Sequence, residues 1–333
     1  MANISHIDET FNHMPNRIPY QDKLTLPLVA APMFLVSNPQ LVIESCNSGI
    51  VGSFPALNQR SSDGFDDWLV QIKSGLTSVA APYAVNLIVH NTNKRLEADL
   101  EVCIKHEVPI IITSLGAVPS LVDSVHEYGG LVYHDITNRR HAMKAAEAGV
   151  DGLILVAGGA GGHAGVVNPI ALVNEIRSFW DKTILLSGCM STGQDIASAL
   201  QMGADLAYMG TRFINTTEAN ADDEYQQMII DSHMDDIVYT AAVSGVHGSF
   251  LKQSLLNAGF SEEMLTLKKK IDFGKELDPE QAEKKAWKTI WSAGQGVTNI
   301  EDVLPVKKLV WRMKTEFARA LDRHNRACSK YDL

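Results

Sequence analysis

The sequence predicts a (β/α)₈ TIM barrel of the α/β class with a C-terminal helical extension. Short apolar runs recur between residues 26 and 213, and a longer helix-like segment separates each run from the next. The runs are apolar at consecutive positions, which is typical of strands buried on both faces of a parallel sheet. Eight strands alternating with helices are the repeat of this barrel. The runs begin at Leu26, Gly49, Tyr83, Val108, Leu131, Asp151, Thr183 and Leu206.

The segments between the runs have helical compositions and end at glycine. Residues 138–149 are rich in helix-forming residues and stop at a glycine suited to a C-cap. Residues 191–203 begin with hydroxyl residues, which favour helix N-caps, and also stop at glycine, as do residues 117–129. A doubly wound sheet is the alternative architecture, but it would not require eight similar units.

The repeat divides the chain into three parts. Residues 1–25 are expected to form an N-terminal lead-in, residues 26–230 the barrel with its eighth helix after Thr217, and residues 231–333 a helical extension that packs over the barrel. The tail has helical charge patterns in residues 261–271, 279–294 and 306–321 and no strand pattern. Its basic run, residues 267–271, is interpreted as a solvated helix face.

Composition restricts the class of partner. The 333 residues are 45% hydrophobic and carry a net charge of −10, which argues against nucleic acid or an anionic membrane surface as a partner. The N-terminus lacks the basic and apolar regions of a secretory signal peptide. We therefore expect a cytoplasmic protein, with no nucleic-acid and no membrane partner. The scattered cysteines fit reduced thiols; they are Cys46, Cys103, Cys189 and Cys328.

Small and polar residues end the last two predicted strands. Ser187, Gly188 and Cys189 end the seventh strand, and Gly210 and Thr211 end the eighth. In this fold the active site lies at the carboxyl ends of the strands, and phosphate groups typically bind after these two. Glycine permits close approach to the backbone N–H groups, although it can also serve only a tight turn. The sequence therefore predicts a phosphate site here.

The loop after the sixth strand is the strongest local signal. It contains five glycines within residues 157–165, which indicates a backbone that passes close to a ligand. His163 is the only titratable side chain in this loop, and an imidazole can exchange a proton near neutral pH. We therefore predict that His163 is catalytic. His134, which closes the fifth strand, is interpreted instead as a core or supporting residue.

Several other chemistries have little support. No histidine or carboxylate pair has the spacing of a zinc site, so no metal site is predicted. The chain also lacks a GxSxG nucleophile elbow and a P-loop.

As a set, the motifs resemble those of the FMN-dependent nitronate monooxygenases, formerly called 2-nitropropane dioxygenases. The resemblance covers about the first two-thirds of the chain and continues weakly in the tail. It rests on APM at 31–33, VNL at 85–87, AGGAGGHAG at 157–165, LLSGCMSTGQD at 185–195, ADLAYMGTRF at 204–213 and SAGQGV at 292–297.

The resemblance implies a barrel that holds FMN without a covalent link. The phosphate would be held at the ends of strands seven and eight, and the isoalloxazine ring would be lined from the first, third, fifth and sixth strands and from the tail. The implied cofactor residues are Ala31, Met33, Asn86, Asp135, Ala157, Gly161, Gly162, Ser187, Gly188, Cys189, Gly210, Thr211 and Gln295.

The resemblance also implies a reaction. His163 matches the family's catalytic histidine, which deprotonates a neutral nitroalkane or positions an anionic nitronate. The nitronate is oxidised with O₂, and a carbonyl compound and nitrite are released.

Two residues depart from the family pattern. Asp135 stands where some members carry lysine, so the charge near the flavin differs, and a carboxylate would repel a nitronate. Cys189 replaces the second glycine of an SGG motif.

Two alternatives remain open. The related flavin-dependent enoyl-acyl carrier protein reductases share the GGH loop but use NAD(P)H. A non-catalytic flavin- or phosphate-binding regulator would leave His163 unexplained. A homodimer through the tail helices is also consistent with the sequence.

Overall fold

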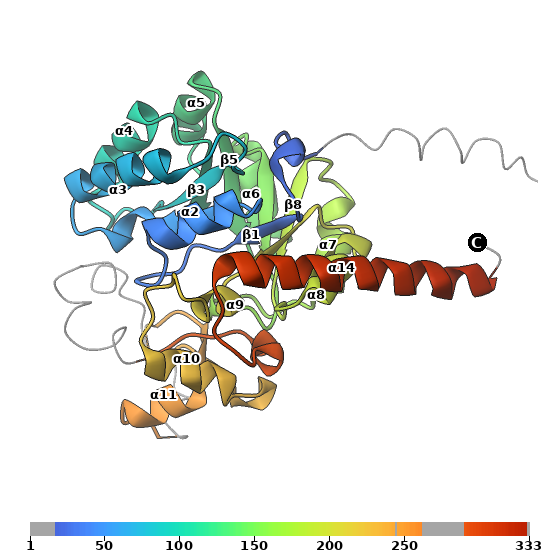
Figure 1. The fold of residues 1–333 in the computed structure, drawn as a ribbon. Coiled ribbons are helices and arrows are strands. Elements are labelled where there is room, and N and C mark those ends of the chain that lie inside the picture. The colour runs from blue at the N-terminus through green and yellow to red at the C-terminus, as the bar shows by residue number, and fades with distance from the viewer. Residues whose placement is uncertain (1–16, 244, 262–289, 332–333) are drawn as a thin grey trace, which may run out of the picture.

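The computed structural model describes residues 17–243, 245–261 and 290–331 (Figure 1). Its large sheet contains eight parallel strands in the order β1-β9-β8-β6-β5-β4-β3-β2. The parallel bridge between Val29 of β1 and Val51, the residue just before β2, closes the barrel. The predicted fold class is therefore confirmed. The barrel strands are β1 (Leu28–Ala30), β2 (Gly52–Pro55), β3 (Tyr83–Ile88), β4 (Ile110–Ser114), β5 (Leu131–Ile136), β6 (Gly152–Val156), β8 (Thr183–Ser187) and β9 (Leu206–Met209).

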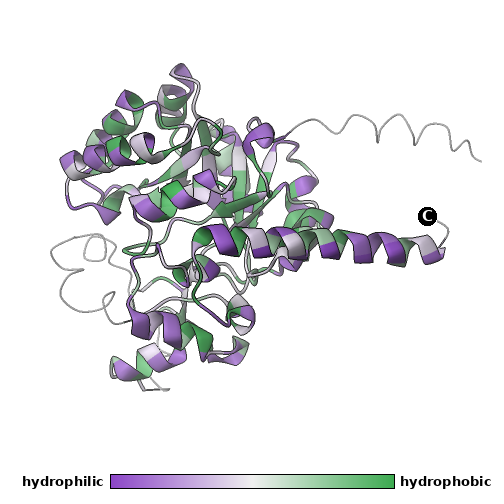
Figure 2. Cartoon of the chain, viewed as in Figure 1, coloured by the Kyte–Doolittle hydropathy of each residue, from purple (hydrophilic) through white to green (hydrophobic). Residues whose placement is uncertain are grey.

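Helices surround the strands and turn their apolar faces inward (Figures 1 and 2). Several begin at a side chain that accepts a hydrogen bond from the first turn, for example Asn38, Ser61 and Thr192. None of the described helices combines the length and apolar character needed to cross a membrane. The helices are α2 (Pro39–Asn47), α3 (Ser62–Gly75), α4 (Leu96–Lys105), α5 (Pro119–Glu127), α6 (Arg139–Glu147), α7 (Pro169–Arg177), α8 (Gly193–Gln201), α9 (Thr211–Ile214), α10 (Asp223–Ile230), α11 (Lys252–Asn257) and α14 (Val306–Cys328).

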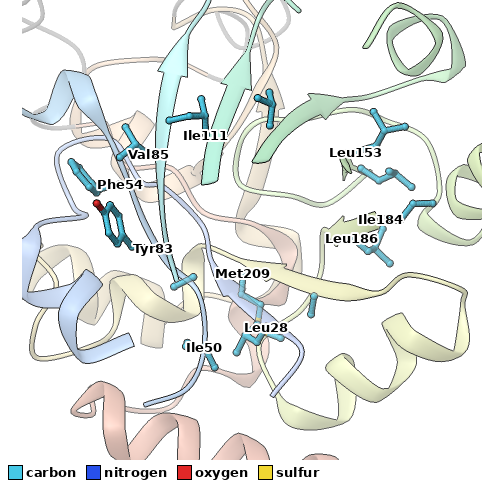
Figure 3. Packing of buried hydrophobic residues seen from close by; sticks show 14 of the residues in the cluster. Leu28, Ile50, Phe54, Tyr83, Val85, Ile111, Leu153, Ile184, Leu186 and Met209 are labelled. Atoms are coloured by element: carbon cyan, nitrogen blue, oxygen red, sulfur yellow. The ribbon is translucent and has the colours of Figure 1, made fainter. Parts of the chain in front are cut away.

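The main core lies between the strands and the helices (Figure 3). Leu28 and Ile50 belong to it, together with outward-facing residues of the other strands such as Val85. A second core fills the barrel interior with residues such as Ile112, Tyr133 and Leu185. This alternation explains why the strand sequences are apolar at consecutive positions.

The N-terminal lead-in closes the amino-terminal end of the barrel. Ile18 belongs to the interior core, and the Tyr133 hydroxyl donates to the Tyr20 hydroxyl over 3.0 Å. The Thr183 hydroxyl, at the start of β8, donates to the Arg17 carbonyl oxygen. Within the described residues, the lead-in thus covers this end of the barrel, and the loops at the carboxyl ends of the strands form the mouth.

Helix α14 occupies the eighth position of the helical ring, in contrast to the predicted boundary at residue 230. It packs between α8 and α2, and its residues Leu309 and Met313 join the main core. The predicted eighth helix, α10, instead packs with the extension, through Tyr225 and Ile229. The end of α14 projects beyond the body of the protein (Figure 1).

The extension also differs from the prediction in its secondary structure, because it is not purely helical. It contributes β10 (Ile237–Thr240) and β11 (Gly248–Leu251), which form a three-stranded antiparallel sheet with β7 (Gly162–His163) of the loop after β6. The strands are too short to leave a periodic signal. Most of the predicted helices at 261–271 and 279–294, including the basic run 267–271, lie outside the described residues.

Candidate active site

Four polar side chains form the floor of the mouth. Each lies two residues beyond an interior core residue on its own strand, and successive residues of a strand point to opposite faces. Asn86 follows Ala84, Ser114 follows Ile112, Asp135 follows Tyr133, and Ser187 follows Leu185. These four residues, Asn86, Ser114, Asp135 and Ser187, are called the floor below.

A hydrogen-bonded relay joins three floor residues. Asn86 Nδ2 donates to Ser114 Oγ over 2.8 Å and to the Ile112 carbonyl oxygen over 3.2 Å. Ser114 Oγ in turn donates to Asp135 Oδ2 over 2.6 Å. Asp135 Oδ1 is buried and has no protein partner among the described residues. Burial raises the pKa of Asp135 to about 6, while the Ser114 hydrogen bond opposes this shift.

Backbone N–H groups are available beyond β8 and β9. Within the described residues, no protein group accepts a hydrogen bond from the amides of Gly188, Cys189, Met190, Thr211 and Arg212. The hydroxyl of Ser187 has no protein partner there either. Such a group of unpaired donors can bind an anion. Unpaired donors therefore lie where the sequence predicts a phosphate site, and the phosphate site itself stays a prediction.

The N-terminus of α8 is not available to a phosphate, because carboxylates already occupy it. Asp195 Oδ2 accepts from the amides of Ser191 and Thr192, each over 2.9 Å. Glu316 of α14 accepts from the Gly193 amide over 2.7 Å. The anion site is therefore limited to the loops directly after the strands.

The extension is fastened to these loops. The Gly294 amide donates to Thr211 Oγ1 over 2.9 Å, and Ser191 Oγ donates to the Gly296 carbonyl oxygen over 2.7 Å. The buried Arg212 guanidinium pairs with Asp302 at 2.9 Å. Arg212 thus anchors the extension, and its side chain is not a phosphate ligand. Thr211 accepts one hydrogen bond but keeps its own hydroxyl proton for a ligand.

Close packing explains most glycines of the loop after β6. A Cβ on Gly159 would lie 2.2 Å from Cys189 Sγ, and a Cβ on Gly161 would lie 2.9 Å from the Gly294 nitrogen. The loop after β8 and the extension thus require these two glycines, independently of any ligand. Gly162 differs, because it has a φ of +67° and open space where a Cβ would stand. It is the loop glycine that the structure leaves open to a ligand.

His163 is held at the mouth by the three-stranded sheet. It pairs with Gly248 of β11, and the next residue, Ala164, accepts a hydrogen bond from the Tyr239 hydroxyl over 2.9 Å. The Tyr239 ring stacks on His247, with 5.1 Å between the ring centroids. The imidazole is open to solvent, yet the surrounding protein lowers the pKa of His163 below its ordinary 6.5. The ring is therefore mostly neutral at pH 7, as a base requires.

Most of the other predicted residues come together near the mouth, whereas Ala157 does not. Ala31, Met33 and Gly210 come together, because a Cβ on Gly210 would lie 3.7 Å from both Ala31 and Met33. Cys189 has a φ of +58°, the left-handed region that glycine favours, and its Sγ lies 3.8 Å from Gln295 Oε1. Ala157, by contrast, is fully buried in the main core, so its side chain does not face the mouth.

The sequence interpretation missed three contributors to the site. Ser114 links Asn86 to Asp135, and its place at the end of β4 could have been found by comparing the ends of the predicted strands. Tyr239 and the strand β11 leave no recognisable pattern, since they act through pairing with a distant loop. His134 is a core residue as interpreted: it is buried, bonded to Thr113 over 2.7 Å, and its pKa is lowered to about 4 by burial.

A closed barrel with a polar floor, unpaired N–H donors and an imidazole at one mouth is the arrangement of a barrel enzyme. The family model for nitronate monooxygenase matches residues 92–316, more than half of the chain. The chain therefore belongs to the nitronate monooxygenase family, and it is an oxidoreductase of a family that is flavin-dependent in general.

The chain is similar to proteins that carry this name and to others that do not. The nitronate monooxygenase of Paraburkholderia phytofirmans is 24% identical over 347 aligned residues, which cover 89% of this chain and 93% of that protein. The (3aS,4S,5R,7aS)-5-hydroxy-7a-methyl-1-oxo-octahydro-1H-indene-4-carboxyl-CoA dehydrogenase of Rhodococcus jostii is 26% identical, over 70% of this chain and 64% of that protein. Among solved structures, FabK from Thermotoga maritima superposes with a TM-score of 0.78 at 21% identity, covering 94% of this chain and 99% of that chain. The structural likeness concerns the fold.

Proposed function

We propose that the protein is an FMN-dependent nitronate monooxygenase that oxidises alkyl nitronates, and nitroalkanes, with O₂ to carbonyl compounds and nitrite. The observation that carries this proposal is that His163, the unpaired N–H donors and the polar floor all belong to the carboxyl-end mouth of the same barrel. Membership of the family supports it. A cytoplasmic location fits the same proposal.

FMN suits the donors that this chain offers. The amides after β8 and β9, with the hydroxyls of Ser187 and Thr211, would hold the phosphate. Asn86, with Ala31 and Met33, would line the ring system, and Gly162 offers open space beside it. When bound, FMN supplies the electron acceptor of the reaction. The chain is acidic, so the anions are attracted by these local donors and not by the net charge.

His163 would act in one of two ways, according to the substrate. With a neutral nitroalkane, an imidazole nitrogen takes the proton from the carbon that bears the nitro group. With a preformed nitronate no proton is removed, and the imidazole positions the anion. The sheet formed with β11 restricts the backbone of His163 and so favours a fixed approach to the substrate.

The proposal is tested first by spectroscopy and then by turnover. We expect the purified protein to carry or bind FMN, and the loaded enzyme to consume O₂ and release nitrite when a propyl nitronate is added. Absence of flavin binding would contradict the proposal. Rapid oxidation of NADH without any nitronate would instead favour an enoyl reductase activity, and assays with and without NADH separate the two.

A pH dependence follows from the lowered pKa of His163. Because the base must be unprotonated, kcat/KM for a neutral nitroalkane should rise with pH through a midpoint below 6.5 and be level above neutrality. Initial rates measured across pH, with the nitroalkane added freshly before it ionises, check this. A midpoint above 6.5, or a rise that persists in a His163→Gln variant, would assign the titration to another group.

A further inference from the structure

The relay in the floor has a fixed direction. The Ile112 carbonyl oxygen can only accept, so the Asn86 atom that contacts it is the amide nitrogen, and this nitrogen also donates to Ser114 Oγ. The single hydroxyl proton of Ser114 then points to Asp135 Oδ2. Asp135 Oδ2 is thus an acceptor and carries no proton. If Asp135 is protonated, its proton stands on Oδ1.

Asp135 Oδ1 is the atom that protein contacts leave unsatisfied. It is buried without a hydrogen-bond partner among the described residues, which is costly for a charged oxygen. An oxygen in this condition either gains a proton or meets a ligand. It belongs to the floor that includes Asn86, which would line the flavin ring.

Among the residues that the structure describes, no positively charged side chain is recorded as acting on Asp135. Neighbouring β4 contributes the Ser114 hydroxyl, and β6 pairs the apolar Ile154 with Asp135. From β9, Tyr208 is the facing titratable group; its pKa is raised by burial and by the Asp135 charge, so it stays neutral. His163 lies at the mouth, and its lowered pKa leaves the imidazole mostly neutral near pH 7, so it supplies no compensating positive charge. If a second negative charge is placed beside this floor, protonation of Asp135 is the change that removes the repulsion between the two charges.

We propose that Asp135 is a proton site coupled to the flavin: its Oδ1 takes up one proton when the bound flavin is reduced and releases it when the flavin is reoxidised. The inference rests on the proposed function, since it requires bound FMN. A bound flavin would take up two electrons and one proton on reduction, and a second proton would come from solvent to Asp135 Oδ1. The uncharged acid avoids a buried pair of negative charges.

The test is the reduction potential of the FMN-loaded protein as a function of pH, measured against an indicator dye without nitronate. Above about pH 6, where Asp135 is ionised before reduction, the wild-type potential should fall about twice as steeply with pH as that of Asp135→Asn, because two protons instead of one accompany two electrons. The asparagine has the shape of the neutral acid and cannot take up the proton.

Ser114→Ala is the second variant. Its lost hydrogen bond no longer lowers the pKa of Asp135, so the pH at which the steeper slope begins should move upward. Equal slopes in the wild type and Asp135→Asn, or an unmoved onset in Ser114→Ala, would overturn the inference. Failure to bind FMN would reject the proposed function, whereas FMN binding with equal slopes would reject only the role of Asp135.

Discussion

Replacing His163 by alanine is expected to lower kcat/KM for a neutral nitroalkane by roughly 10²- to 10⁴-fold, the usual contribution of a general base. Bound FMN should be retained, because the anion donors lie after β8 and β9 and not on the β7 loop. With a preformed nitronate the loss should be smaller, since that substrate has no proton to remove. Oxygen uptake with both substrates, normalised to flavin content, measures the difference.

His126→Ala is the matched control. His126 is also a partly exposed histidine, but it pairs with Asp151 at 2.8 Å near the amino-terminal end of the barrel. Its removal should leave turnover unchanged. If His163→Ala keeps full activity on the nitroalkane, His163 is not the base. An equal loss with both substrates would assign it to positioning alone.

Replacing Gly193 by alanine should lower the free energy of unfolding by about 3 kcal/mol or more. The added Cβ would stand 1.9 Å from the Met313 carbonyl oxygen and 2.6 Å from the Phe317 nitrogen. Both are backbone atoms of α14, so no side-chain rotation can relieve the clash, and the helix must move away from α8. Urea denaturation followed by circular dichroism measures the change.

Gly129→Ala separates this clash from the ordinary cost of losing a glycine. Gly129 has a φ of +85° but nothing within 4 Å of its Cβ position. Its replacement should cost only the strain of a left-handed alanine, about 1 kcal/mol. Should Gly193→Ala prove no less stable than Gly129→Ala, the close seating of α14 on α8 would be wrong.

The barrel could be predicted because its strands are buried on both faces. Tyr133 fills the interior and Val132 the outer core, so neighbouring residues are apolar and the run is visible in one sequence. Which helix occupies the eighth position of the helical ring could not be predicted. The apolar stripe of α14, with Leu309 and Met313, shows that one face is buried but not which helices it meets. Position along the chain therefore assigned α10 to the barrel and α14 to the extension, in contrast to their packing.

The candidate site was partly predictable for a related reason. Asn86, Asp135 and Ser187 stand at the ends of recognisable strands, so their meeting at one mouth follows from the fold. The support of His163 by β11 depends on pairing between segments more than eighty residues apart, and no local pattern encodes it. The sequence analysis interprets the glycines at 159 and 161 as leaving space for a ligand. In the structure, Cys189 and Gly294 fill the space beside these two glycines.

Closure of the barrel sets an order for folding during synthesis. Strand β1 pairs with β9, so Leu28 meets its partner Ala207 only after nearly the whole barrel sequence has been translated. At about 5–20 residues per second the ribosome needs roughly 10–35 s to cover that distance. During this interval one edge of β1 stays unpaired, and the apolar surface that α14 later covers stays exposed for longer still. Until α14 has been synthesised, the nascent chain therefore presents an unpaired strand edge and an uncovered apolar surface, both of which favour aggregation.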